Sequence, residues 1–249
     1  MTTESETTEK NEYPKATNGV IFGTLVSFAG FITLLMAFCS PYWIESYEES
    51  QSSFKNMGLW EYCFKNFVYP YYQFPKFFHG CHNVFSHEYY VIREYLVPGW
   101  LISVQFFVTI AFVLTMISMA ILSLVIVRWP LKAVLQYEWI FIKTAFICIA
   151  ISSVFMFLGV VIFGSCAYRR DWLMYPKFNV LSWSYALAVV SFIVLGLGGL
   201  ILHRESKNAF EIRGEAKNLV MQMEMQEPGF QQSRHHHSQS VSRSLQGYI

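Results

Sequence analysis

Four long stretches of the chain contain no Asp, Glu, Lys or Arg, and this feature restricts the possible fold more than any other. Each stretch is long enough to cross a hydrocarbon core of about 30 Å as an α-helix. An isolated strand cannot satisfy its backbone hydrogen bonds in lipid, so each crossing must be helical. The predicted spans lie near residues 20–39, 101–125, 144–165 and 181–202.

The composition agrees with a polytopic membrane protein. Hydrophobic residues make up 54% of the 249 and charged residues only 14%, which is too apolar for an ordinary soluble domain. The net charge of +1, with basic residues scattered among acidic ones, gives no support for a nucleic-acid partner. The lipid bilayer is therefore the partner that the composition predicts.

No motif for catalysis is present. The sequence has no P-loop, HExxH, CxxC or nucleophile elbow, and no carboxylate or histidine lies in the middle of a predicted span. We therefore expect no enzyme activity, no cofactor and no metal.

The spans divide the chain into an N-terminal segment, residues 1–18, a four-span domain, residues 19–202, and a tail, residues 203–249. The outer loops cover 41–97 and 168–180. The polar N-terminal segment lacks the basic start of a secretory signal, so we expect the first span to be retained. Basic residues flank both short loops, so charge alone leaves the orientation nearly balanced.

Two cysteines decide the orientation. Of the five cysteines, only Cys63 and Cys81 lie in a polar loop, and they make a plausible disulfide on the oxidising side of a membrane. The alternative is two free thiols in a cytosolic loop. With the disulfide, the first loop is outside and both termini are cytoplasmic. His79 and His82 flank Cys81, but the paired spacing of a zinc site is missing.

The first outer loop is long enough to fold by itself. Residues 42–47 and 59–64 alternate in polarity and are rich in aromatic and β-branched residues, which predicts antiparallel strands. Ser86 is a candidate cap for a helix that runs through Tyr95 into the second span. The aromatic run 64–78 is either a belt on the outer leaflet or a contact surface for another molecule.

Small residues recur in the first and fourth spans. Gly23, Ser27 and Gly30 form one stripe, and residues 195–200 are rich in glycine. Such positions let helices approach closely in lipid. The alternative is that glycine is simply common in spanning helices.

Trp43, the run Gly58-Leu59-Trp60, Cys63 and Cys81 together resemble the signature of claudins and the wider peripheral myelin protein/claudin superfamily. Arg93 stands where the family carries an arginine before its second span. The resemblance implies an all-α membrane fold: a left-handed four-helix bundle with a small extracellular antiparallel β-sheet. Four strands would come from the first loop and one from the second, pinned by Cys63–Cys81. In the family the GLW segment seats the sheet on the bundle; alternatively, Trp43 and Trp60 are simple interfacial anchors.

The sequence also departs from the family pattern. Seventeen residues separate the two loop cysteines, more than the family usually has, so the hairpin between them is expanded. The cysteines that claudins often carry after the fourth span are missing. The bulky aromatic loop is most similar to claudin-like proteins of invertebrate septate junctions.

The resemblance implies a protein of lateral cell–cell junctions in the plasma membrane that forms a paracellular barrier of the septate or tight-junction type. Its partners would be copies of itself or other claudin-like proteins in cis and in trans, and junction complex proteins. The alternative from the same superfamily is an auxiliary subunit of an ion channel or receptor. The candidate paracellular charges are Glu45, Glu48, Glu49 and Glu61. The candidate contacts of the second loop are Trp172, Tyr175, Pro176 and Phe178.

The tail begins with a mixed amphipathic segment at 208–213 and then becomes polar, and residues 231–240 have the composition of a disordered segment. The last residues, Gly247, Tyr248 and Ile249, are a candidate ligand for a PDZ scaffold, because a free carboxylate with an apolar last residue adds as a strand to PDZ domains. The alternative is an untethered end.

Overall fold

The computed structural model describes residues 17–47, 50–69, 76–128, 131–170, 172–173 and 176–245. The chain divides into two compact units, Met1–Glu205 and Ser206–Ile249. The first holds the helical bundle and a β-sheet, and the second holds the tail.

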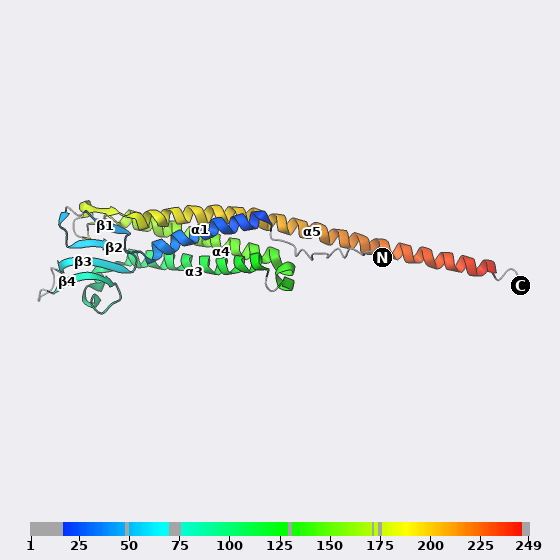
Figure 1. The fold of residues 1–249 in the computed structure, drawn as a ribbon, viewed down its shortest axis with the longest axis horizontal. Coiled ribbons are helices and arrows are strands. Elements are labelled where there is room, and N and C mark those ends of the chain that lie inside the picture. Colours follow the sequence, from blue (N-terminus) through cyan, green and yellow to red (C-terminus); the bar gives the residue numbers. More distant parts are fainter. Residues whose placement is uncertain are drawn as a thin grey trace, which may run out of the picture. The chain divides into compact units, whose positions relative to one another are not determined.

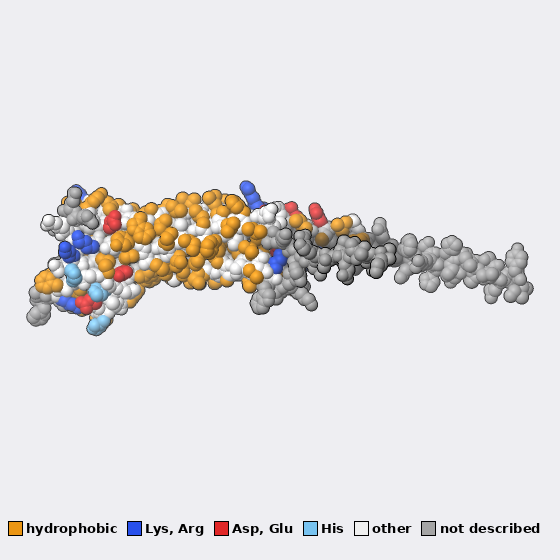
Figure 2. Space-filling model, in the orientation of Figure 1, with side chains coloured by type: hydrophobic (Ala, Val, Ile, Leu, Met, Phe, Trp, Pro, Cys, Tyr) orange, Lys and Arg blue, Asp and Glu red, His pale blue; other side chains and the backbone are white. Residues whose placement is uncertain are grey.

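Four helices of the described chain are long and apolar enough to cross a membrane (Figure 1). The four spanning segments lie within α1 (Asn18–Cys39), α3 (Gly99–Val127), α4 (Leu131–Cys166) and α5 (Trp183–Leu245). The backbone of α4 departs from helical geometry at Tyr137, and its spanning part runs from there to Cys166. Hydrophobic side chains cover the visible face of the bundle along its length, as expected of a surface solvated by lipid tails (Figure 2).

Helices α1 and α5 pack through the stripe of small residues. A side chain at Gly23 would meet Leu202, one at Gly30 would meet Leu195, and one at Gly198 would collide with Ser27. Ser191 also donates a hydrogen bond to the carbonyl of Gly30 at 3.1 Å. The small residues therefore serve close helix packing, which confirms the first interpretation of the stripe.

Helices α3 and α4 are joined by buried hydroxyl groups. Thr115 and Ser152 share a hydrogen bond of 2.6 Å, and Ser152 also donates to the carbonyl of Ala111 at 2.8 Å. Ser118 donates to the carbonyl of Ala145 at 3.1 Å. Hydrogen bonds of this kind between helices support association in lipid, where the hydrophobic effect gives little.

A five-stranded antiparallel sheet lies at one end of the bundle (Figure 1). Its spatial order is β4-β3-β2-β1-β5. The first loop supplies β1 (Ile44–Ser46), β2 (Phe54–Met57), β3 (Glu61–Val68) and β4 (Phe77–Asn83), and the second supplies β5 (Asn179–Leu181). This confirms the division into four strands and one.

Three element boundaries differ from the prediction, and the first is the third span, which was predicted near 144 but begins at Tyr137. The helix expected to begin after Ser86 starts only with the 3-10 turn η2 (Tyr90–Ile92) and α2 (Arg93–Leu96), because Arg93 binds the carbonyls of the preceding loop and holds it irregular. Leu181, expected at the start of the fourth span, pairs with Ile44 in the sheet. The helix α5 therefore begins two residues later, at Trp183.

The second unit is helical as far as Leu245 and differs from the predicted disorder of residues 231–240. Between residues 205 and 223 the chain contains no proline and many good helix formers, such as Ala, Glu, Lys, Leu and Met. This composition favours helix at the start of the unit.

Candidate functional site

The candidate site is the outer sheet, defined as strands β1 to β5 together with the loop 84–98 that leads from β4 into α3. Pairing places Leu181, Ile44, Met57, Tyr62 and His82 in one row across the strands. The three central side chains of this row are buried, so this face packs inward. The neighbouring row carries Glu45, Asn56, Cys63 and Cys81 on the opposite face, as the alternation along strands requires.

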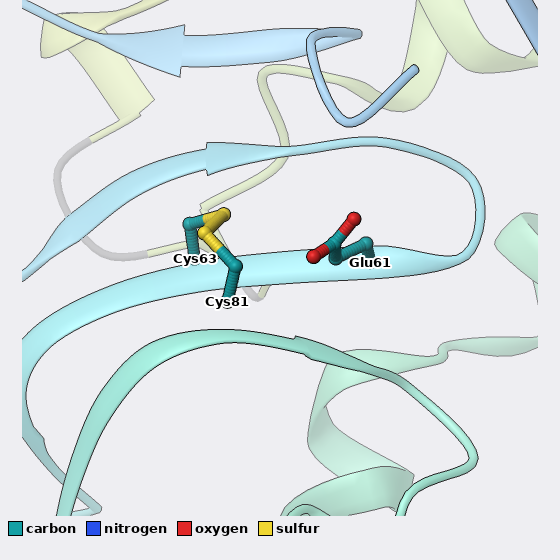
Figure 3. Close-up of side chains that lie close together, drawn as sticks. All are labelled: Glu61, Cys63 and Cys81. Atoms are coloured by element: carbon teal, nitrogen blue, oxygen red, sulfur yellow. A yellow bond between two sulfur atoms is a disulfide. The ribbon is translucent and has the colours of Figure 1, made fainter. Parts of the chain in front are cut away.

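A disulfide joins Cys63 in β3 to Cys81 directly opposite in β4. This confirms the bridge over the alternative of two free thiols. The Glu61 carboxylate lies beside the two sulfur atoms (Figure 3), and the three groups fall within 4.8 Å of one another. Metal binding by cysteine needs thiolates, and here both sulfurs are used in the covalent bond. The disulfide therefore cross-links the β3–β4 hairpin, and the cluster is not a metal centre.

Trp43 fixes the start of β1 to the bundle. Its side chain is fully buried, and the indole Nε1 donates a hydrogen bond of 2.7 Å to the carbonyl of Ala37 near the end of α1. The ring also meets Phe163 of α4 edge-on, with centroids 4.8 Å apart. Trp43 therefore ties together three elements and is not a simple interfacial anchor.

The segment Gly58-Leu59-Trp60 makes the turn between β2 and β3 and packs against two helices. A side chain at Gly58 would collide with the carbonyl oxygen of Ser40 and would lie 2.7 Å from Cα of Pro41. The carbonyl of Leu59 accepts a hydrogen bond of 2.6 Å from Gln105 of α3. Trp60 packs on Phe38 of α1, with ring centroids 5.3 Å apart. These contacts agree with the seating role that the family resemblance implies.

Two buried tyrosines link the sheet to the loop before α3. Tyr62 donates to the carbonyl of Leu96, and Tyr89 donates to the carbonyl of Tyr62 at 3.0 Å. Burial raises the pKa of Tyr62, and burial, with Glu88 and Glu61 nearby, raises the pKa of Tyr89. Both hydroxyls therefore stay protonated and remain donors at physiological pH.

Arg93 organises the loop after β4. Its guanidinium donates to the carbonyls of Val84 at 3.3 Å and Phe85 at 3.2 Å, with a longer bond of 3.5 Å to Ser86. It also lies 5.4 Å from the centroid of the Tyr90 ring, a cation–π contact. One planar cation thus satisfies three successive backbone acceptors, which explains an arginine at this position.

The candidate contact residues of the second loop differ in how exposed they are. Trp172 is only 3% exposed and meets Trp100 at right angles, with centroids 4.6 Å apart. It therefore anchors this loop to the bundle, and the prediction that it contacts another molecule is withdrawn. Phe178 is exposed and Pro176 is half-buried. Tyr175 lies outside the described residues.

Of the candidate charges, Glu45 and Glu61 are half-buried on the face of the sheet that carries the disulfide. Glu48 and Glu49 lie outside the described residues, and so do Gly247, Tyr248 and Ile249 at the end of the tail. Lys76 pairs with Glu88 at 3.1 Å between two half-exposed side chains, a contact worth little in free energy.

Three further residues of the site, Gln105, Tyr62 and Tyr89, were not predicted from the sequence. Gln105 is a buried amide within the second span, and an amide side chain inside a spanning helix is itself a signal of a specific partner. The two tyrosines carried no such signal, because aromatic residues are abundant throughout the loop.

These features define a membrane protein with four spanning helices and a disulfide-pinned sheet at one end of the bundle. A family model described as PMP-22/EMP/MP20/Claudin tight junction matches residues 28–203. The chain belongs to this family, whose members are structural and junction proteins of membranes. A search of curated proteins returns no match.

Proposed function

We propose that the protein forms or organises a paracellular barrier at lateral cell–cell junctions, with the outer sheet projecting into the space between cells. The disulfide supports this orientation, because such bonds persist on the oxidising side of a membrane. Both termini then lie in the cytoplasm. The tail end, Gly247 to Ile249, would be available there to a PDZ scaffold.

The observation that carries the proposal is the firm attachment of the outer sheet to the helices. Trp43, Leu59 and Tyr62 are fully buried, and each takes part in a hydrogen bond to a helix or to the loop before α3. A sheet held in this way keeps a fixed orientation to the membrane. Fixed presentation lowers the entropy that is lost when copies on facing membranes bind one another.

The outer sheet also offers apolar surface for such contacts. Phe77 on the edge strand β4 is 65% exposed, and Phe85 and Tyr90 in the following loop are 57% and 66% exposed. Apolar side chains gathered at one end of a protein mark interaction surfaces more often than chance. We propose that they contact neighbouring claudin-like chains. Within the aromatic run 64–78 this proposal concerns Phe77, because Phe64, Phe67 and Phe78 are buried in the sheet.

Mosaic cell layers test the proposal. When tagged protein is expressed in only some cells, we expect it to concentrate at borders between two expressing cells and to be depleted at borders with non-expressing cells. Contacts between identical outer sheets require this result. An even distribution over the surface, with an ion channel or receptor co-purifying, would instead establish the auxiliary-subunit role.

A further inference from the structure

Two basic side chains lie on the surface of the bundle at the end opposite the outer sheet (Figure 1). Lys143 is exposed on α4, between the exposed apolar residues Ile140 and Ile147. Arg204 is exposed on α5, one turn beyond the exposed Leu200. Exposed positions on a spanning helix face lipid, so both bases border surface that lipid tails cover.

Lys143 lies inside the spanning part of α4. That part begins at Tyr137, so Lys143 is about 9 Å of helix from its start. At this depth a lysine extends its long apolar stem along the helix and brings its ammonium group to the membrane interface. The phosphates of lipid headgroups lie at that level, so the position of Lys143 favours contact with a lipid phosphate.

The packing of α4 on α5 brings further polar groups to this place. The rings of Phe146 on α4 and His203 on α5 lie with centroids 4.7 Å apart. Lys143 precedes Phe146 by one turn, so the two side chains are neighbours on the surface of α4. Arg204 follows His203 directly. Lys143, His203 and Arg204, here called the basic cluster, therefore gather beside the α4–α5 interface.

The acidic side chains at this end of the bundle are engaged elsewhere. Glu138 pairs with Arg128 at 3.2 Å, between α4 and the end of α3. The carboxylate of Glu205 packs against Gly19 at the start of α1, where an added side chain would collide with it. Neither exposed base of the cluster forms an ion pair with any residue that the structure describes. Their two positive charges therefore have no counter-ion in the described part of the chain.

We propose that the basic cluster binds an anionic phospholipid, with the headgroup at Lys143 and Arg204 and the acyl chains along the apolar surface of α4 and α5. A zwitterionic headgroup carries an amine that compensates its own phosphate, whereas an anionic headgroup leaves a net negative charge for the two bases. The orientation proposed above places the cluster in the cytoplasmic leaflet, which contains anionic lipid. Lipid binding here does not require that the protein form a barrier.

Binding of phosphatidylserine to the purified full-length protein in detergent tests the site. Native mass spectrometry over a range of lipid concentrations gives its affinity, with phosphatidylcholine measured in the same way. We expect phosphatidylserine to bind more tightly. Lys143→Gln should weaken phosphatidylserine binding about fivefold, and Lys143→Gln together with Arg204→Gln about thirtyfold, because each juxtamembrane charge contributes separately to the attraction of anionic lipid. Both side chains are exposed, so neither change removes buried packing.

Two further variants make the result specific. Lys65→Gln removes an equal charge from an exposed position on β3 and should leave the affinity unchanged. Lys143→Arg keeps the charge and should retain most of the affinity, since both side chains bind phosphate. Equal affinity for phosphatidylcholine, or full phosphatidylserine affinity in the double variant, overturns the proposal. Competition by inorganic phosphate at the concentration of the lipid would show that a free anion is the ligand, and this outcome overturns it as well.

Discussion

Replacing Gly58 with alanine is expected to lower the free energy of unfolding by at least about 1–3 kcal/mol, the usual cost of overpacking, and to keep most of the protein from the cell surface. The added methyl group would collide with the backbone of Ser40 and Pro41 where α1 ends. Backbone atoms cannot move aside as a flexible side chain can, so the turn between β2 and β3 must lift from the bundle. Thermal unfolding in detergent and surface biotinylation measure the two effects.

Gly99 supplies the matched control. It is the first residue of α3, and a side chain there meets nothing within 4 Å. Gly99→Ala should therefore leave unfolding unchanged or raise stability slightly, because alanine favours helix. If Gly58→Ala proved as stable as Gly99→Ala, the close approach between the GLW turn and the end of α1 would be wrong.

Removing the disulfide by the double substitution Cys63→Ser and Cys81→Ser is expected to cost about 3 kcal/mol, by the entropy of closing a loop of this length. The bond joins the edge strand β4 to β3, so its loss should loosen that hairpin first. Limited proteolysis under native conditions should then cut within residues 64–84 while the helical bundle remains protected.

The change Cys39→Ser is the control for this prediction. Cys39 is a free, exposed thiol at the end of α1, so its replacement should change neither proteolysis nor surface level. Equal protease resistance of the double variant and the wild type would show that the hydrogen-bonded ladder alone holds β4 in place.

The main architecture of the bundle was predictable because lipid permits few solutions. Uncharged stretches of sufficient length gave four helices, and the spacing of Gly23, Ser27 and Gly30 gave the face of α1 that packs on α5. The disulfide followed from the position of Cys63 and Cys81 in the polar loop. Each of these signals is local in the sequence and follows from one physical requirement.

Other residues that attach the sheet to the bundle were less predictable than Trp43 and the GLW segment, because their roles depend on contacts across long distances in the chain. Trp172 resembled an exposed contact residue, yet its indole lies against Trp100, far earlier in the sequence. Tyr62 and Tyr89 act through carbonyl groups that only the folded loop brings near. Serine is a common residue at the N-cap of a helix, but the backbone carbonyl of Ser86 instead accepts a hydrogen bond from Arg93.

The barrier is tested most directly by tracer permeability across an epithelium depleted of the protein and then supplied with either the wild type or Gly58→Ala. We predict that depletion increases the leak of an uncharged tracer between cells, that the wild type restores the seal, and that Gly58→Ala does not. An unchanged leak after depletion, with the protein located away from cell contacts, would contradict the account.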